Sequence, residues 1–156
     1  MIEIAPANLE QMPQVKILFE EYARSLDFDL AFQGFEAELT TLPGAYAPPK
    51  GCILLAQIEG EAAACIAFRQ INETTAEMKR LYVKPAHQGK GLGRKLTQAL
   101  LEKARAAGYK KIRLDTVPSM EAAIKLYLAL GFREIEAYRE NPIPGAAFFE
   151  KDLSEP

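Results

Sequence analysis

The chain has 156 residues, of which 49% are hydrophobic and 26% charged. This length fits one domain with one core, and the composition excludes a largely disordered chain. Two cysteines are too few for a disulfide scaffold or a cysteine-rich zinc site, and a single histidine argues against a metal centre. No apolar run approaches the ~18 residues of a membrane span, and the first residues lack the pattern of a signal peptide, so a cytoplasmic location is expected.

The net charge of −2 hides an uneven distribution. Residues 79–113 contain eleven lysines and arginines but one acidic residue, a net charge of +10, and the rest of the chain carries −12. A segment this basic indicates either an anionic ligand or a solvated basic face.

The first half of the chain shows helical and strand patterns in alternation. The spacing of apolar residues predicts a helix from the cap Asn8 to about Leu26 and a short helix over residues 35–42. Strands are predicted at residues 1–5, 51–58, 62–71 and 76–83, the last three as a meander. Alternation along the last strand places one set of side chains (Met78, Arg80, Tyr82) on one face and a second set (Glu77, Lys79, Leu81, Val83) on the other.

The second half continues the alternation. A helix is predicted from Gly91 to a left-handed cap at Gly108, and a second helix starts at Pro118-Ser119. Strands are predicted at residues 111–117, 133–138 and 146–153. The element order β-α-α-β-β-β-α-β-α-β-β predicts one α/β domain over residues 1–156, with a mixed sheet of about six or seven strands and about four helices.

The stretch 88–93, Gln-Gly-Lys-Gly-Leu-Gly, lies between a predicted strand and a predicted helix. Three glycines in five residues let backbone N–H groups turn toward a ligand, and a helix N-terminus adds partial positive charge. This pattern is typical of a pyrophosphate-binding loop. The alternative is a glycine-rich turn with no ligand. The stretch matches neither the Walker loop nor the dinucleotide fingerprint GxGxxG. Asp115 stands where a ribose-binding acid could lie, which keeps a nucleotide ligand open.

The same stretch resembles the coenzyme A loop of the GNAT superfamily of N-acetyltransferases. Residues 123–127, Ala-Ile-Lys-Leu-Tyr, followed by Gly131-Phe132, resemble the second motif of that family. The separation of the two motifs and the order of elements also agree, over nearly the whole chain. The resemblance implies a GNAT-like acyl-CoA N-acyltransferase fold with a mostly antiparallel central sheet. It also implies transfer of an acetyl group from acetyl-CoA to a primary amine of a small molecule or peptide, in a ternary complex.

The resemblance also implies roles for individual residues. Backbone groups of two segments (Leu81, Tyr82 and Val83; Gln88, Gly89, Lys90, Gly91, Leu92, Gly93 and Arg94) would hold the pantetheine arm and the pyrophosphate. Tyr127 would protonate the departing thiolate as a general acid; otherwise it is one more aromatic residue of the core. Glu77 would act as the base that deprotonates the amine, or it is a solvent-facing carboxylate paired with a neighbour such as Lys79.

One position departs from the family pattern. Met120 stands where the family often carries an asparagine, with Ser119 beside it as the remaining candidate for a coenzyme contact. Tyr138 and Asn141, in a turn-rich segment, are candidates for the acceptor pocket, or ordinary turn residues. The acidic remainder of the chain favours a cationic amine as acceptor through long-range attraction.

Two other functions stay open. One is a non-catalytic domain that binds coenzyme A; the other is a nucleic-acid-binding module that uses residues 79–113, which the scarcity of aromatic residues in that segment argues against. The expected partners are an amine acceptor and, at most, a second copy of the chain, with no membrane, no metal and no nucleic acid.

Overall fold

The computed structural model describes residues 1–154, which form a seven-stranded sheet with the order β1-β2-β3-β4-β5-β7-β6. The strands are β1 (Ile2–Pro6), β2 (Cys52–Ile58), β3 (Glu61–Asn72), β4 (Thr75–Val83), β5 (Lys111–Thr116), β6 (Arg133–Ile135) and β7 (Ala147–Asp152). The α-helices are α1 (Met12–Ser25), α2 (Phe35–Thr41), α3 (Leu92–Ala106) and α4 (Glu121–Ala129). The predicted element order and the mixed sheet are confirmed, because β4 and β5 are parallel and the other paired strands are antiparallel.

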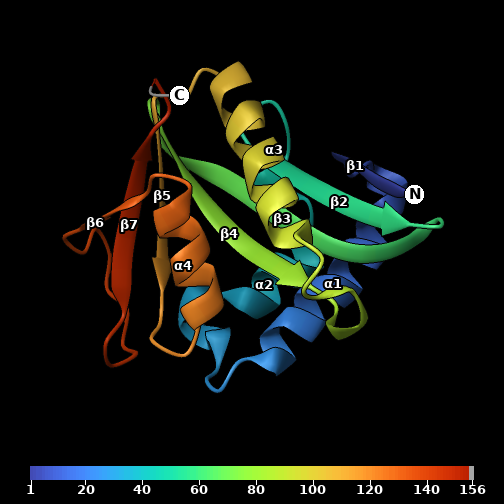
Figure 1. Cartoon of the computed structure of the whole chain (residues 1–156), viewed down its shortest axis with the longest axis horizontal. Coiled ribbons are helices and arrows are strands. Elements are labelled where there is room, and N and C mark those ends of the chain that lie inside the picture. Colours follow the sequence, from blue (N-terminus) through green and yellow to red (C-terminus); the bar gives the residue numbers. More distant parts are fainter. Residues whose placement is uncertain (155–156) are drawn as a thin grey trace.

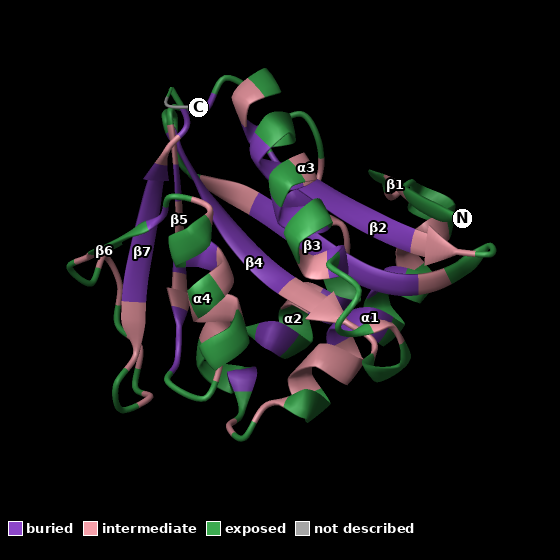
Figure 2. Cartoon of the chain, viewed as in Figure 1, coloured by how far each residue is buried: buried purple, intermediate pink, exposed green. Residues whose placement is uncertain are grey.

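Helices cover both faces of the sheet. Helices α3 and α4 lie on one face, and α1 and α2 lie on the other (Figure 1). Each face has its own apolar cluster, one built around the leucines of α3 and one around Val15, Leu18 and Phe19 of α1. The middle strands β2, β3 and β4 are mostly buried between these layers, whereas the edge strand β1 is exposed (Figure 2).

Helix termini lie close to where the sequence places them. The side chain of Asn8 accepts a hydrogen bond from the backbone N–H of Gln11, and the side chain of Gln11 accepts one from the backbone N–H of Asn8, a capping box before α1. Gly108 has φ +95 at the end of α3, as expected for a left-handed cap. The strand predicted over 133–138 ends at Ile135, and Tyr138 instead turns toward the sheet to contact Glu77.

Strands β4 and β5 pair along only part of their length. Their parallel register covers Thr75 to Glu77 against Lys111 to Arg113, and beyond that point the two strands diverge. The divergence is visible in Figure 1, where α4 lies in front of the gap. Among residues 1–154, the backbone of β4 from Met78 onward therefore has no strand partner on its β5 side.

A β-bulge in β4 lies beside this divergence. The register with β3 shifts between Cys65↔Tyr82 and Ala67↔Lys79, and Arg80 has φ +65. The extra residue breaks the alternation of side chains, so Arg80 joins Lys79 on the face of α1 and α2. Leu81 packs against the cluster of the opposite face, together with Met78. Relative to Glu77 and Met78, the predicted faces of the four residues from Arg80 to Val83 are thus wrong, because simple alternation fails at a bulge.

A row of alternating charges crosses five strands at the level where β4 and β5 part. The register pairs Arg69 with Glu77, Glu77 with Arg113, Arg113 with Glu150, and Glu150 with Arg133. Ion pairs of 2.8 to 3.0 Å join three of these four pairs of residues: Arg69 with Glu77, Arg113 with Glu150, and Arg133 with Glu150. Opposite charges on directly opposed positions stabilise a sheet, so this row holds the strands together at the apex of the gap.

Candidate active site

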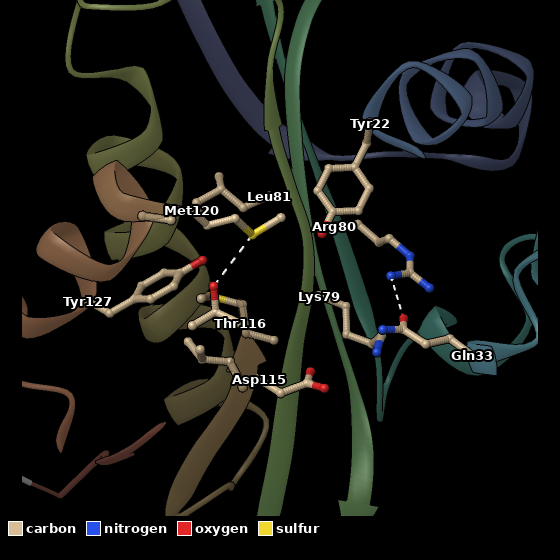
Figure 3. A pocket seen from close by; sticks show the side chains of 12 residues that line it. Tyr22, Gln33, Lys79, Arg80, Leu81, Asp115, Thr116, Met120 and Tyr127 are labelled. Atoms are coloured by element: carbon tan, nitrogen blue, oxygen red, sulfur yellow. Dashed lines mark hydrogen bonds between the residues drawn. The ribbon is translucent and has the colours of Figure 1, made fainter. Parts of the chain in front are cut away.

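A cavity of about 60 Å³ occupies the gap between β4 and β5. Its walls come from β4, β5, the start of α4, and Tyr22 and Gln33 on the other side of the sheet (Figure 3). The cavity therefore connects the two faces of the sheet. Tyr127 and Met120 lie at its α4 end, and Tyr22, Gln33 and Lys79 lie at its α1 end.

Tyr127 enters the gap from α4 with its hydroxyl directed into the cavity (Figure 3). Its side chain is buried, its ring contacts that of Phe132, and the hydroxyl has no hydrogen-bond partner among residues 1–154. Burial raises the pKa of Tyr127, so the phenol keeps its proton at neutral pH and can donate it. Both readings of Tyr127 fit these facts, since the residue is part of the core and lines the cavity.

The glycine loop presents a run of unpartnered N–H groups. Gly89 and Gly91 have φ +80 and +76, which glycine adopts without strain, and Gly91 caps the N-terminus of α3. The backbone N–H of Gln88 donates to Pro85 and that of Lys95 to Gly91, whereas the six N–H groups from Gly89 to Arg94 donate to no acceptor within residues 1–154. Six adjacent donors at the positive end of a helix suit a pyrophosphate.

The loop is fixed to the end of β4. The side-chain Nε2 of Gln88 donates to the backbone oxygen of Val83 at 3.0 Å. Leu81 lines the cavity, and Tyr82 is directed to the other face, where its hydroxyl lies 3.3 Å from Glu21. The structure thus places Leu81, Val83 and the loop in one continuous stretch along the α3 and α4 face.

Glu77 is fully buried and lies at the apex of the gap. Its carboxylate accepts hydrogen bonds from Arg69 Nε at 3.0 Å, from the Tyr138 hydroxyl at 2.7 Å and from Arg139. Burial raises the pKa of Glu77, but the charges of Lys79 and Arg139 with the hydrogen bond from Tyr138 outweigh it, so the pKa is lowered. The interpretation of Glu77 as a solvent-facing carboxylate is wrong, and Glu77 and Leu81 lie on opposite faces because of the bulge.

Lys79 and Arg80 lie side by side on the wall that faces α1 and α2. The Arg80 guanidinium makes two hydrogen bonds to Glu38, at 2.8 and 2.9 Å, and a third to Gln33 at 2.8 Å. These contacts anchor α2 to β4 and offset the strain of a left-handed arginine, which costs about 1–2 kcal/mol. Lys79 has one ion pair among the described residues, with Glu77 at 3.9 Å.

The two acceptor candidates lie in different places. Asn141 Nδ2 donates to Asp115 Oδ2 at 3.0 Å, and both residues line a second small cavity that adjoins the first through Asp115, Thr116 and Met120. Tyr138 does not line either cavity; it packs edge-on against Phe148 and bonds Glu77. Ser119 is exposed in the turn before α4, and Met120 lines the cavity in its stead.

Sequence reasoning assigned no site role to Lys79 or Arg80 and considered Asp115 only as a ribose-binding acid, although all three shape the acceptor side. Lys79, Arg80 and Asp115 all line the cavity. The one available signal was a pair of adjacent basic residues inside an otherwise apolar strand. Within residues 1–154 there is no group of three or more histidine, cysteine, aspartate or glutamate side chains arranged for a metal, and no helix is long and apolar enough to span a membrane.

The profile of the acetyltransferase (GNAT) family matches residues 14–132. The chain therefore belongs to the GNAT family of acetyltransferases, as the two motifs indicated. An uncharacterized N-acetyltransferase of Schizosaccharomyces pombe is 35% identical over 98% of this chain and 96% of its own length. The N-acetylaspartate synthetase of Rattus norvegicus is 34% identical over 63% of this chain, which corresponds to 33% of that protein.

Solved structures show the same fold. A crystal structure described as a putative acyl-CoA N-acyltransferase from Klebsiella pneumoniae has a TM-score of 0.72 and 30% identity, covering 98% of both chains. A putative acetyltransferase from Salmonella typhimurium, solved with its cofactor acetyl-CoA, has a TM-score of 0.72 and 22% identity over 99% of this chain and 95% of that chain. The GNAT fold predicted from sequence is confirmed.

Proposed function

We propose that this acetyltransferase, as a single domain over residues 1–156, moves the acetyl group of acetyl-CoA to a primary amine that meets it in the gap between β4 and β5. The observation that carries the proposal is the gap itself: its cavity is lined by Leu81 and Tyr127, and β4 runs on from Leu81 to the loop whose six N–H groups have no acceptor among the described residues. The amine nitrogen forms the new C–N bond, the C–S bond breaks, and one proton leaves the amine while one reaches the sulfur.

Each part of the gap has a task in this reaction. Acetyl-CoA supplies the activated acetyl group. The N–H groups from Gly89 to Arg94 bind the pyrophosphate, and the backbone of β4 near Leu81 and Val83, which β5 does not pair, binds the pantetheine arm and polarises the thioester oxygen. Tyr127 donates its proton to the departing thiolate. With Met120 in place of a polar side chain, Ser119 is left as the candidate for a contact from the turn before α4.

The role of Glu77 in this scheme is to position rather than to take a proton. Its base role stays a prediction, but a carboxylate with three hydrogen-bond donors and a lowered pKa is a poor proton acceptor. Its cross-strand partners Arg69 and Arg113 belong to β3 and β5. Glu77 thus fixes the point at which the strands part, and with it the width of the gap.

Two measurements test the proposal. Calorimetric titration with acetyl-CoA, beside NADH and ATP, asks whether the loop selects coenzyme A; equal affinity for all three would contradict the assignment. Release of free thiol on addition of amines then asks whether transfer occurs. A non-catalytic coenzyme A-binding domain would bind acetyl-CoA but release no thiol with any amine.

The acceptor, the cellular location and the oligomeric state are proposals as well. Since one relative is named an N-acetylaspartate synthetase, aspartate belongs in the first set of amines to be tested. Asn141 lies where it can contact the acceptor, beside Asp115. Tyr138 acts through Glu77. We propose a cytoplasmic enzyme that acts as a monomer or homodimer and needs no metal, nucleic acid or membrane.

A further inference from the structure

We propose that the acceptor is an amine that carries a carboxylate close to the reacting nitrogen, as an amino acid does, and that Lys79 is the residue that selects it by binding this carboxylate. The inference rests on the proposed function, because it concerns the same gap. It follows from the charges on the α1 side of the gap and from which of them already have partners.

Positive charge exceeds negative charge at this end of the gap. Three cationic side chains (Lys79, Arg69 and Arg139) lie within 4 Å of the single carboxylate of Glu77, which leaves a local surplus of two charges. The side chains of Arg69 and Arg139 are 27% and 26% exposed, whereas Lys79 is 6% exposed, so solvent screens the charge of Lys79 least. A buried ammonium without a close hydrogen-bond acceptor is costly unless an anion binds it.

Among these cations, Lys79 is the one with donors to spare toward the cavity. Arg80, which also lines the cavity, already has hydrogen bonds to Glu38 and Gln33. Arg69 and Arg139 donate to Glu77. Lys79 lines the cavity and donates no hydrogen bond to any described residue from 1 to 154, and its contact with Glu77 is 3.9 Å long.

The opposite wall suits the amine of the same molecule. Asp115 on β5 faces the gap across from Lys79 (Figure 3), and the one hydrogen-bond partner of its carboxylate within residues 1–154 is Asn141. A cation on one wall and a carboxylate on the other match a zwitterion, with its carboxylate toward Lys79 and its ammonium toward Asp115. A polyamine would meet Lys79 with the same sign of charge and would be repelled.

The pKa of Lys79 is consistent with this arrangement. Burial lowers it to about 8, although Glu77 and Asp115 oppose the shift. A bound carboxylate would favour the charged form of the lysine. The acidic remainder of the chain, which suggested a cationic acceptor, lies mostly on distant, solvated surface, where salt reduces its effect beyond about 8 Å. The charges inside the gap therefore determine which acceptor binds.

The test compares matched acceptors. The twenty standard L-amino acids are screened with acetyl-CoA by thiol release, and the best is then compared with its α-amide and with the amine that lacks the α-carboxylate. We expect kcat/KM for the amino acid to exceed that of both analogues by on the order of 10- to 100-fold, the range for a hydrogen bond to a charged group. Equal use of all three would overturn the inference.

Variants then assign the effect to Lys79. Lys79→Met should raise KM for the amino acid by on the order of 10- to 100-fold and leave KM for the α-amide and for acetyl-CoA nearly unchanged, so the preference disappears. Lys79→Arg should keep part of the preference for the amino acid. Lys16→Met, at an exposed lysine of α1, should leave KM for both acceptors unchanged. A loss of rate that is equal for amino acid and amide would show a merely structural lysine.

Other outcomes separate this inference from the proposed function. If uncharged or cationic amines are acetylated and no amino acid is, the inference fails and the proposed function stands. If no amine releases thiol from bound acetyl-CoA, the proposed function fails and the inference with it. Thermal unfolding of each variant shows whether it folds, and Lys79→Gln replaces Lys79→Met if the latter does not; the comparison of acceptors on the unaltered protein needs no variant.

Discussion

The two sides of the gap between β4 and β5 are built from different parts of the chain. On the side of α3 and α4, the proposed binding groups are backbone N–H groups from one continuous segment, Gly89 to Arg94, with Tyr127 as the proposed acid. On the side of α1 and α2, they are charged side chains from distant segments: Arg80 is held by Glu38, 42 residues away in the chain, and Asp115 by Asn141, 26 residues away.

This difference predicts different consequences of mutation. Backbone donors depend on the conformation of the loop, so a change there should affect coenzyme binding and little else. Side chains held by long-range ion pairs serve stability and acceptor choice together, so changes there should affect both.

Gly91→Glu should abolish acetyl-CoA binding. The change places a carboxylate at the N-terminus of α3, where the pyrophosphate would lie, on a residue with φ +76. Calorimetry should show a loss of affinity of at least about 100-fold, because the new carboxylate and the pyrophosphate repel each other as like charges at close range. Gly60→Glu is the control, because Gly60 has φ +80 in the turn between β2 and β3 and carries the same strain. Equal affinity of both variants for acetyl-CoA would remove the loop assignment.

Arg80→Met should lower the free energy of unfolding by about 3–5 kcal/mol. The change breaks a buried ion pair and leaves the Glu38 carboxylate, 11% exposed, without its charged partner and with the hydrogen bond from Tyr46 alone. Urea denaturation measures the loss, and Arg24→Met, at an exposed arginine of α1, should stay within about 0.5 kcal/mol of the unaltered protein. A loss below about 1 kcal/mol for Arg80→Met would show that the bulge does not depend on this contact.

Tyr127→Phe should lower kcat by about 100-fold and leave the affinity for acetyl-CoA unchanged, because general acid catalysis contributes about 10²–10⁴-fold. Thiol-release kinetics with calorimetry separate the two effects. Tyr109→Phe is the matched control, since its hydroxyl donates to the Lys50 backbone outside the gap. An unchanged kcat would leave Tyr127 as a core residue, and the acid would have to be sought elsewhere.

Glu77→Gln should change how stability depends on pH. The folded pKa of Glu77 is lowered from 4.5, so the folded state binds fewer protons than the unfolded state, and stability from this group is present above that value and lost as pH falls below it. We expect the variant to lose about 1.5–3 kcal/mol at pH 7 and to show a flatter stability profile below pH 4.5.

Denaturation at several pH values measures this profile, with Glu73→Gln in the exposed β3–β4 turn as control. Glu77→Gln also tests, in kinetic measurements, whether Glu77 acts as the base. A positioning residue should change acceptor KM and kcat together without moving the pH of half-maximal rate, whereas loss of a base should remove the lower limb of the pH profile.

The same division explains how much could be predicted from the sequence. The glycine loop and the second motif are local, because glycine conformation and helix start depend on neighbouring residues, so their positions followed from the sequence. The face on which Arg80 lies did not follow from the sequence, because a bulge turns this side chain toward Glu38 and Gln33, which are far away in the chain.

Two further positions show the same limit. Tyr138 was expected in a strand near the acceptor, but its hydroxyl bonds Glu77, a contact that spans 61 residues. The charged row from Arg69 to Arg133 depends on the register of five strands, and register is a property of the assembled sheet. The order of elements was predictable from periodicity; the partners of charged side chains were not.

The most direct test of the division is calorimetric titration of three proteins with acetyl-CoA: the unaltered chain, Gly91→Glu and Lys79→Met. We expect the unaltered chain and Lys79→Met to bind acetyl-CoA with the same affinity, within about twofold, and Gly91→Glu to show no measurable binding. If Lys79→Met lost affinity as Gly91→Glu does, or if Gly91→Glu bound normally, the two sides of the gap would not be separate binding regions, and the account would be wrong.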